Sequence, residues 1–431
     1  MTRPPTRPPT RPPTRPPTLL ADRLADRLDE RLADADADLA TRYPGDAGTR
    51  QPVHTAYVPA DRFTAGTHRE WGDAALRLLD EHAPSAADLT AATGVDAQDV
   101  HERVRAALVR EPVQDLRVDF EDGYGLRTDA EEDGAATAAA TAIAAAARAA
   151  DGPAWIGLRC KSLEAATRRR GLRTLELVVA GLLDAGGLPD GFVVTLPKVT
   201  SVAQVEAMVE VCAALEQAYG LAPSRLGFEV QVETSQAVLD AGGTATVARM
   251  VGAAQGRCTG LHYGTFDYSA ALGISAAHQS LEHPVADHAK AVMQLAAAGT
   301  GVRLSDGSTN VLPVGSTDAV HAAWRLHARL VRRSLERGYY QGWDMHPGHL
   351  PTRYLATYAF FREALPAAAA RLRGYLDRVE GGTMDEPATA QALAGTVLRG
   401  VLCGAVDAAE VEQRTGVPQA RLEALVRRTA P

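Results

Sequence analysis

Charged side chains that suit chemistry on oxygen-rich substrates follow a series of short apolar runs in this sequence of 431 residues. In chain order they are Glu121, Asp122, Arg159, Lys198, Glu233 and Asp267. Carboxylate oxygens are preferred ligands of Mg²⁺, and the planar fork of an arginine can bind a carboxylate or a developing enolate oxygen through two hydrogen bonds. These residue types therefore indicate metal-assisted chemistry on a carbonyl or a carboxylate.

Glu233 and Asp267 are the predicted metal ligands. They follow neighbouring apolar runs, and two hard oxygen ligands so placed suit Mg²⁺, or Mn²⁺ in its place, while leaving coordination positions for water and substrate. The alternative is that each carboxylate caps the helix after it, because acidic residues are common at helix starts. Their shared context favours the metal site.

Glu121 and Asp122 form a carboxylate pair that could hydrogen-bond the waters of a metal and orient an arginine. The alternative is a solvated turn leading to Gly123 and Gly125. Arg159 ends the next apolar run and is predicted to contact the substrate and to stabilise negative charge on oxygen. A salt bridge from Arg159 to either acid is compatible with that role.

Lys198 follows Pro197 at the end of a further apolar run, where its ammonium could bind a carboxylate or a phosphate. A structural ion pair is the alternative. Lys198 is therefore a candidate substrate-binding residue.

Short β-rich runs alternate with long alanine-rich helical stretches from residue 53 onward, a pattern that requires parallel strands with helical crossovers. The pattern predicts an α/β fold, a (β/α)₈ TIM barrel whose strand ends bring the charged residues to one rim. A doubly wound open sheet is the competing topology, but no GxGxxG turn follows an early strand. The expected strands are Val53–Val58, Leu116–Phe120, Trp155–Arg159, Gly191–Leu196, Leu226–Val232, Gly260–Tyr263, a segment within Val302–Val314, and Tyr339–Met345.

Four regions are predicted along the chain. Residues 1–18 are expected to be a disordered proline-rich arm, because Thr-Arg-Pro-Pro repeats four times there. Residues 19–52 are expected to form an amphipathic helix and a linker, and residues 53–349 the catalytic barrel. Residues 350–431 are expected to form a C-terminal helical extension.

Composition excludes several classes of function. The net charge is −8 and no basic stripe with interleaved aromatic residues occurs, so nucleic acid is not an expected partner. No apolar run approaches the length of about 20 residues that a membrane helix needs, and no secretory signal is evident, so a cytoplasmic protein is expected. The cysteines have neither disulfide-framework nor zinc-site spacing; they are Cys160, Cys212, Cys258 and Cys403.

Several short motifs in one order resemble those of the citrate lyase beta-subunit and HpcH/HpaI aldolase superfamily, which includes malyl-CoA lyases and is related to malate synthases. The resemblance runs from about residue 53 to residue 395. The long insertion before Leu116 and an extra C-terminal helix mark a divergent member. The motifs are Tyr57–Arg62, Val118–Gly123, Leu196–Val199, Val232–Thr234, Tyr263–Tyr268 and Met345–Pro347.

The resemblance implies that Glu233 and Asp267 are the metal ligands, and that the acids at 121 and 122 support the metal shell. It also implies a homo-oligomer, a trimer or hexamer, in which C-terminal segments reach a neighbouring active site. Gly382–Pro387 resembles a C-terminal motif whose aspartate acts in relatives that use acyl-CoA, so Asp385 is a candidate acid/base. An N-cap for the last helices is the alternative for Asp385.

The expected function is that of a Mg²⁺-dependent carbon–carbon lyase or aldolase, which cleaves or forms a bond to a 2-oxo acid or acyl-CoA through an enolate. A coenzyme A thioester is a candidate substrate, although no phosphate-cradling glycine loop is evident. The alternatives are a malate-synthase-like condensation of acyl-CoA and a non-catalytic barrel scaffold. Metal titration separates the scaffold from the enzymes.

Overall fold

The structure is a computed structural model that describes residues 20–377 and 387–427. Its backbone divides into two units, residues 1–44 and residues 45–431. The first unit contains the helix α1 (Leu20–Arg42), none of whose residues is buried. The second unit contains the barrel and the C-terminal helices.

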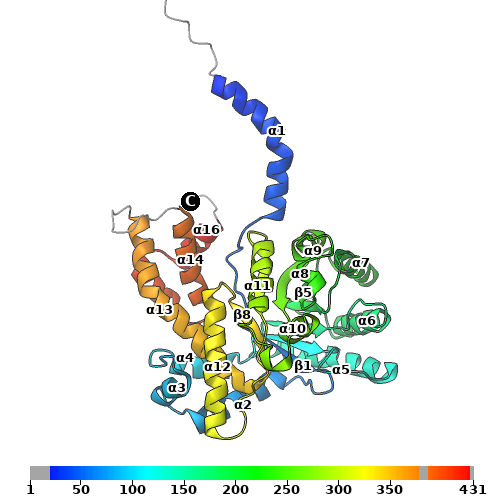
Figure 1. Ribbon diagram of the computed structural model, residues 1–431, viewed down its shortest axis with the longest axis vertical. Coiled ribbons are helices and arrows are strands. Elements are labelled where there is room, and N and C mark those ends of the chain that lie inside the picture. The colour runs from blue at the N-terminus through cyan, green and yellow to red at the C-terminus, as the bar shows by residue number, and fades with distance from the viewer. Residues whose placement is uncertain (1–19, 378–386, 428–431) are drawn as a thin grey trace, which may run out of the picture. The chain divides into compact units, whose positions relative to one another are not determined.

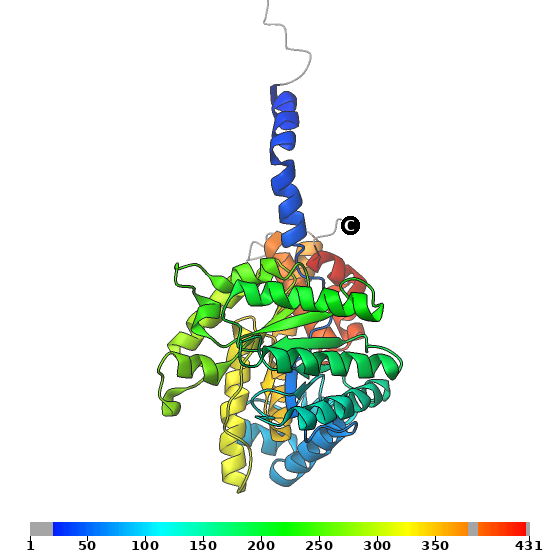
Figure 2. The ribbon, with the colours of Figure 1, turned by 90° about the vertical axis from the view of Figure 1, so that its right-hand side faces the viewer.

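Eight parallel strands close into a barrel in sequence order, with β1 paired to β8. The predicted (β/α)₈ barrel is therefore confirmed, and the open doubly wound sheet is excluded. The helices that follow the strands lie outside the barrel in both views (Figure 1, Figure 2). The strands are β1 (His54–Pro59), β2 (Asp115–Asp119), β3 (Trp155–Arg159), β4 (Phe192–Leu196), β5 (Gly227–Val232), β6 (Cys258–Tyr263), β7 (Arg303–Asp306) and β8 (Gln341–Asp344).

The crossovers are helical, as alternating strand and helix patterns require. The insertion after β1 consists of α2 (Thr67–His82), α3 (Ala86–Thr93) and α4 (His101–Arg110). The later connections contain α5 (Asp129–Arg148), α6 (Arg168–Asp184), α7 (Val202–Tyr219), α8 (Ser235–Val238), α9 (Thr246–Ala253), α10 (Thr265–Ala271), the 3₁₀ turn η1 (Ala276–His278), α11 (Pro284–Ala297) and α12 (Thr317–Glu336).

The predicted C-terminal helical extension is present. It begins with the 3₁₀ turn η2 (Pro347–His349) and continues through α13 (Leu350–Leu376), α14 (Pro387–Leu402), α15 (Ala408–Thr415) and α16 (Gln419–Val426). The phenol of Tyr354 on α13 donates a 2.7 Å hydrogen bond to the carbonyl of Glu111, so the extension is tied to the end of the insertion. Within residues 20–377 and 387–427, no helix is both long and apolar enough to cross a membrane.

The alanine-rich helix α5 shows how local sequence sets these elements. Thr128 and Glu131 form a capping box, in which each side chain accepts a hydrogen bond from the other residue's backbone N–H. Small residues then allow a close approach to α6: a Cβ added to Gly181 would lie 2.7 Å from the Cβ of Ala140. The helix therefore starts by capping and is positioned by small side chains.

The interior of the barrel contains buried charged side chains. Arg117 is fully buried and pairs with Asp115, which is two residues before it on β2, and with Glu229 on β5 at 3.1 Å. Glu229 also lies 3.2 Å from Nε2 of His262 on β6. Alternate strand residues share a face, so these groups form a charged layer that links β2, β5 and β6 below the rim.

Candidate active site at the barrel rim

The rim residues singled out in the sequence lie at the carboxyl ends of successive strands. They follow β2 (Glu121, Asp122), end β3 (Arg159), and follow β4 (Lys198), β5 (Glu233) and β6 (Asp267). In a (β/α)₈ barrel these ends form one face, where active sites are built. Asp385 lies outside the described residues.

Arg159 is held by an acid that the sequence analysis did not single out. Its Nε and Nη2 each donate a 2.7 Å hydrogen bond to Asp119, at the end of β2. Glu121 is more distant, with Oε2 3.4 Å from Nη1 of Arg159. Burial alone would lower the pKa of Arg159, but Asp119, Glu121 and Glu233 outweigh burial and raise it above its ordinary value. The guanidinium of Arg159 is therefore fixed in position and positively charged.

Two aromatic rings enclose the guanidinium of Arg159. Its Cζ lies 5.0 Å from the ring centroid of Tyr57 on β1 and 5.5 Å from that of Trp343 on β8. These distances are within the range of cation–π attraction. This contact was hard to predict from the sequence, because both aromatic residues lie within apolar runs. The pairing of β1 with β8 brings the two rings together.

Lys198 connects three of the rim acids. Its Nζ lies 2.5 Å from Glu121, 2.7 Å from Asp122 and 3.9 Å from Asp267. Its backbone N–H donates a 2.7 Å hydrogen bond to Oε1 of Glu233. The backbone of Lys198 has a φ of +51°, an uncommon conformation for a residue with a side chain, which persists where surrounding contacts fix it. The structural ion pair weighed for Lys198 is present, and it faces the predicted metal ligands.

Glu233 is buried, with 2% of its surface exposed. Burial raises the pKa of Glu233 to about 8, and the nearby carboxylates of Asp267 and Glu121 act in the same direction while Arg159 opposes them. Glu233 does not cap the next helix, because Thr234 accepts the capping hydrogen bond from the N–H of Ala237. The carboxyl group accepts a hydrogen bond from the backbone of Lys198 and is not used to cap α8.

Asp267 lies in the first turn of α10, and its side chain is 46% exposed. That helix starts after Gly264 without a side-chain cap, so the capping alternative fails for Asp267 as well. Partial burial raises the pKa of Asp267, Lys198 lowers it, and Asp122 raises it again. The carboxyl group of Asp267 is therefore partly exposed, 3.9 Å from Nζ of Lys198.

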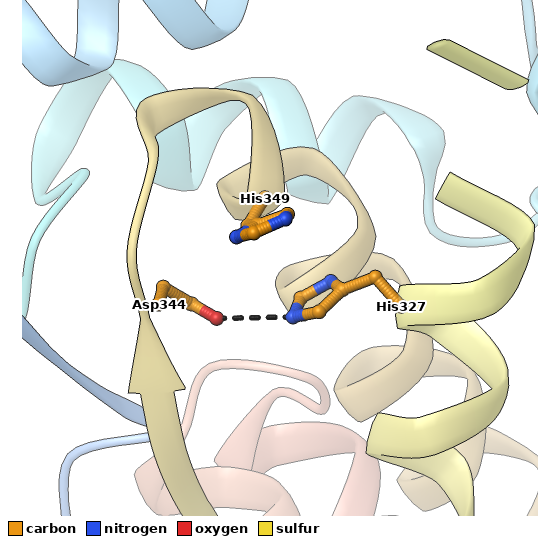
Figure 3. A group of neighbouring side chains, drawn as sticks. All are labelled: His327, Asp344 and His349. Atoms are coloured by element: carbon orange, nitrogen blue, oxygen red, sulfur yellow. Dashed lines mark hydrogen bonds and ion pairs between the residues drawn. The ribbon is translucent and has the colours of Figure 1, made fainter. Parts of the chain in front are cut away.

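A second group of metal-type ligands connects a barrel strand with the helices around it: Asp344 on β8, His327 on α12 and His349 in η2 (Figure 3). Asp344 Oδ1 already accepts a 3.1 Å contact from His327 Nε2 and a 2.8 Å hydrogen bond from Arg353. The two imidazole rings stack with centroids 4.5 Å apart and 19° between their planes, so their in-plane lone pairs do not converge on one point. We interpret this cluster as packing of β8 against α12 and α13.

The sequence matches a family model, and the structure is similar to solved structures of the same fold. A family model described as "Domain of unknown function (DUF6986)" matches residues 32–430. None of the curated proteins matches the sequence.

A citrate lyase from Burkholderia xenovorans LB400 is similar in structure, with a TM-score of 0.56, 18% identity, and coverage of 83% of this chain and 93% of that one. At that identity the likeness concerns the fold alone. The protein CitE from Mycobacterium tuberculosis, in complex with magnesium, acetoacetate and coenzyme A, has a TM-score of 0.48, 20% identity, and coverage of 83% and 99%. A malate synthase from Haloferax volcanii, a lead(II) complex, has a TM-score of 0.48, 16% identity, and coverage of 88% and 98%.

Proposed function

The chain belongs to the DUF6986 family, and we propose that it is a Mg²⁺-dependent carbon–carbon lyase or condensing enzyme of the citrate lyase and aldolase type. The proposed substrate is a 2-oxo acid or an acyl-CoA that reacts through an enolate. One observation carries the proposal: five carboxylates gather with two cationic side chains at the rim, all but Glu233 in contact with one of the cationic groups. They are Asp119, Glu121, Asp122, Glu233 and Asp267, with Arg159 and Lys198.

The donor set fits a divalent cation. Burial raises the pKa of Glu233 to about 8, and the neighbouring carboxylates of Asp267 and Glu121 act in the same direction, so a negative charge at Glu233 is costly without a cation. A hard cation shared with Asp267 would relieve that cost, and carboxylate oxygens are the ligands that Mg²⁺ and Mn²⁺ prefer. Glu233 and Asp267 would therefore hold the ion. When bound, it would supply Lewis-acid polarisation of a substrate carbonyl.

Arg159 would bind the substrate through Nη1. Asp119 occupies Nε and Nη2, whereas Nη1 has only 3.4 Å contacts to Gln231 and Glu121. Nη1 is thus the donor available to a substrate carboxylate or to negative charge developing on oxygen. Such fixed donors stabilise a transition state without having to reorganise.

Glu121 and Asp122 would hydrogen-bond the waters of the metal and take part in proton transfer. Burial raises the pKa of Glu121, and Arg159 and Lys198 oppose this effect. Glu121 is the member of the pair proposed to exchange a proton. Asp122 shares Lys198 with Glu121, so any movement of the ammonium changes both acids. Asp385 remains a proposed acid/base, supplied by a neighbouring subunit of a trimer or hexamer.

An activity panel tests the proposal. Chelator-treated protein is incubated with glyoxylate or pyruvate and a short acyl-CoA, and in the reverse direction with the condensed products, with and without Mg²⁺ or Mn²⁺. We expect turnover that requires the metal and is lost in Glu233→Gln and Asp267→Asn. Turnover that survives chelation and both substitutions would contradict the proposal. The absence of both turnover and Mg²⁺ or Mn²⁺ binding would favour the non-catalytic scaffold.

A further inference from the structure

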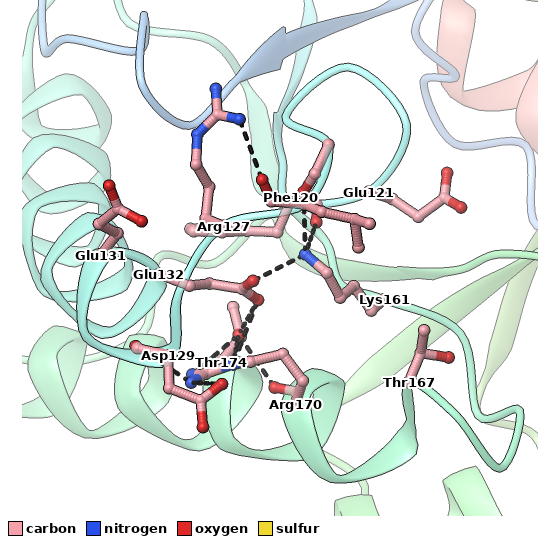
Figure 4. Close-up of polar contacts among 12 residues, drawn as sticks. Phe120, Glu121, Arg127, Asp129, Glu131, Glu132, Lys161, Thr167, Arg170 and Thr174 are labelled. Atoms are coloured by element: carbon pink, nitrogen blue, oxygen red, sulfur yellow. Dashed lines mark hydrogen bonds and ion pairs between the residues drawn. The ribbon is translucent and has the colours of Figure 1, made fainter.

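Lys161 is a buried lysine beside the site that the sequence analysis passed over. It lies two residues after Arg159 and is 7% exposed. Its Nζ donates hydrogen bonds to the carbonyl of Phe120 at 2.7 Å and to Oε2 of Glu132 at 2.7 Å, and lies 3.5 Å from the carbonyl of Gly125 (Figure 4). The three hydrogens of one ammonium group are thus directed at three fixed acceptors.

Two of these acceptors are the ends of the loop 120–125, which follows β2 and carries Glu121 and Asp122. The same loop is held on its other side by Asp119, which accepts hydrogen bonds from the N–H groups of Glu121 at 3.0 Å and Gly123 at 2.9 Å. Asp119 in turn binds Arg159. Lys161 and Asp119 therefore grip the loop from two sides.

Glu132 fixes the lysine in place. It is fully buried on α5 and accepts a 2.6 Å hydrogen bond from the hydroxyl of Thr174 on α6 in addition to that from Lys161. Nε of Arg170 lies 3.4 Å from the same carboxylate (Figure 4). Breaking a buried charge pair is costly, because the remaining charge stays buried without that partner. The Lys161–Glu132 pair is thus supported by contacts from both α5 and α6.

Aromatic contacts also connect Lys161 with the loop 120–125. The Lys161 ammonium lies 5.5 Å from the ring centroid of Tyr124, within the loop itself. The Tyr124 ring also packs edge-on against Phe120, with centroids 5.6 Å apart. The loop 120–125 is therefore closed around Lys161 by two carbonyls and a ring.

We propose that Lys161 is a positioning residue, which sets where Glu121 and Asp122 stand relative to Arg159 and Lys198. The proposal rests on the proposed function for its kinetic consequence, but its structural consequence can be measured without any activity. Lys161 itself would touch neither substrate nor metal. Residues that orient a site in this way commonly cost about tenfold to a hundredfold in activity or metal affinity when they are removed.

Lys161→Met tests the proposal, with Lys290→Met as the matched control. Lys290 is also buried and has the same kinds of partner: the carbonyl of Leu281 at 2.8 Å, the carboxylate of Asp306 at 3.0 Å and the ring of Tyr263 at 5.7 Å. Both variants lose a buried ammonium, so both lose stability. Only Lys161→Met is expected to speed amide hydrogen exchange in residues 121–125 by at least about tenfold.

The kinetic readout separates positioning from a loss of stability. We expect kcat of Lys161→Met to fall by about tenfold to a hundredfold, with KM within about threefold of wild type, at a temperature where the protein is fully folded. Lys290→Met should keep both constants. If Lys161→Met does not fold, Glu132→Gln is used, because it keeps the shape of the Lys161–Glu132 pair and weakens the interaction. It should change loop exchange and kcat in the same direction by a smaller amount.

Unchanged loop exchange in Lys161→Met and Glu132→Gln, or equal changes in Lys290→Met, would overturn the proposal. Failure of the proposed function is distinguishable from this result. If Glu233→Gln still binds Mn²⁺ like wild type, the metal site is wrong whatever Lys161 does. If Glu233→Gln loses Mn²⁺ while Lys161→Met keeps wild-type kcat and loop exchange, only the role of Lys161 fails.

Discussion

Gly264 stands where Glu233 leaves no room for a side chain. A Cβ added at Gly264 would lie 2.4 Å from Cβ of Glu233 and 2.6 Å from its Oε2. The backbone at Gly264 is extended, with a φ of −98°, so the requirement is for space and not for a left-handed turn. The glycine at this rim position therefore lets β5 and β6 present the Glu233 carboxyl group to the site.

We predict that Gly264→Ala weakens Mn²⁺ binding by at least about tenfold while the protein stays folded, because the new methyl group displaces one ligand. Isothermal titration with Mn²⁺ measures the effect. Gly252→Ala on α9 is the matched control, since a Cβ there meets nothing within 4 Å. Equal Mn²⁺ affinities in the two variants would show that the space beside Glu233 is not needed for the metal.

At the scale of elements, two buried histidines lie beside the end of the barrel formed by β8: His54 on β1, whose Nδ1 is 3.8 Å from Asp344, and His349 in η2. Burial lowers the pKa of His349 to about 3, and burial lowers the pKa of His54 to about 4 although Asp344 acts in the opposite direction. Both rings are therefore neutral in the folded protein at pH 7. His349 accordingly uses one ring nitrogen to donate a 3.0 Å hydrogen bond to the carbonyl of Val311.

This arrangement makes stability depend on pH. An unfolded histidine takes up a proton below its ordinary pKa of 6.5, whereas folded His349 does so only near a pKa of about 3. Between these two pH values the unfolded state binds more protons than the folded state. The free energy of unfolding is therefore highest above pH 6.5 and decreases as the pH falls below it. For each pH unit between the two pKa values, protonation stabilises the unfolded state relative to the folded state by about 1.4 kcal/mol. The loss of stability by about pH 4 is therefore on the order of a few kcal/mol per histidine.

We predict that His349→Gln flattens this dependence. The glutamine amide can still donate to the Val311 carbonyl but takes up no proton. Urea unfolding at pH 7, 6 and 5 gives the slopes, and His278→Gln at an exposed position is the control that should keep the wild-type slope. Parallel slopes for wild type and His349→Gln would mean that His349 is already charged in the folded protein.

Much of the barrel was predictable because strand signals are local. Trp155–Arg159 was predicted with its observed bounds, and the other apolar runs were placed within a few residues. The seventh strand was only located within Val302–Val314, because β7 (Arg303–Asp306) is short and mixes polar with apolar residues. The alternation of strands with helices then limits the topology to very few arrangements.

The contacts of the site were less predictable because they depend on closure of the barrel. Asp119 was assigned to the interior of an apolar run, yet it is the main partner of Arg159 from the neighbouring strand. Trp343 reaches Arg159 only because β8 pairs with β1. Lys161 gave no motif at all, since its partners come from a loop and from α5. Pairings between distant segments are set by tertiary structure and not by spacing along the chain.

At the scale of the whole molecule, the expected oligomer leads to a complementation experiment. If Asp385 acts in a neighbouring subunit, Asp385→Ala and Glu233→Gln are each inactive as pure oligomers. Mixed oligomers would contain some sites with both groups intact, so mixing the two variants should restore part of the activity. Mass analysis confirms that hybrids form. Hybrids without activity would contradict a shared site, and an active Asp385→Ala protein would contradict the acid/base role.

The central claim is that Glu233 and Asp267 hold a divalent cation at the barrel rim, and direct titration with Mn²⁺, followed by electron paramagnetic resonance, tests it most directly. Wild-type protein, Glu233→Gln and Asp267→Asn are compared with Glu282→Gln, a partly exposed acid paired with Arg329 at 2.5 Å. We predict one tight site in wild type and Glu282→Gln, and a loss of affinity of at least about a hundredfold in the two rim variants, with unchanged melting profiles. Equal Mn²⁺ affinity in all four proteins would contradict the claim.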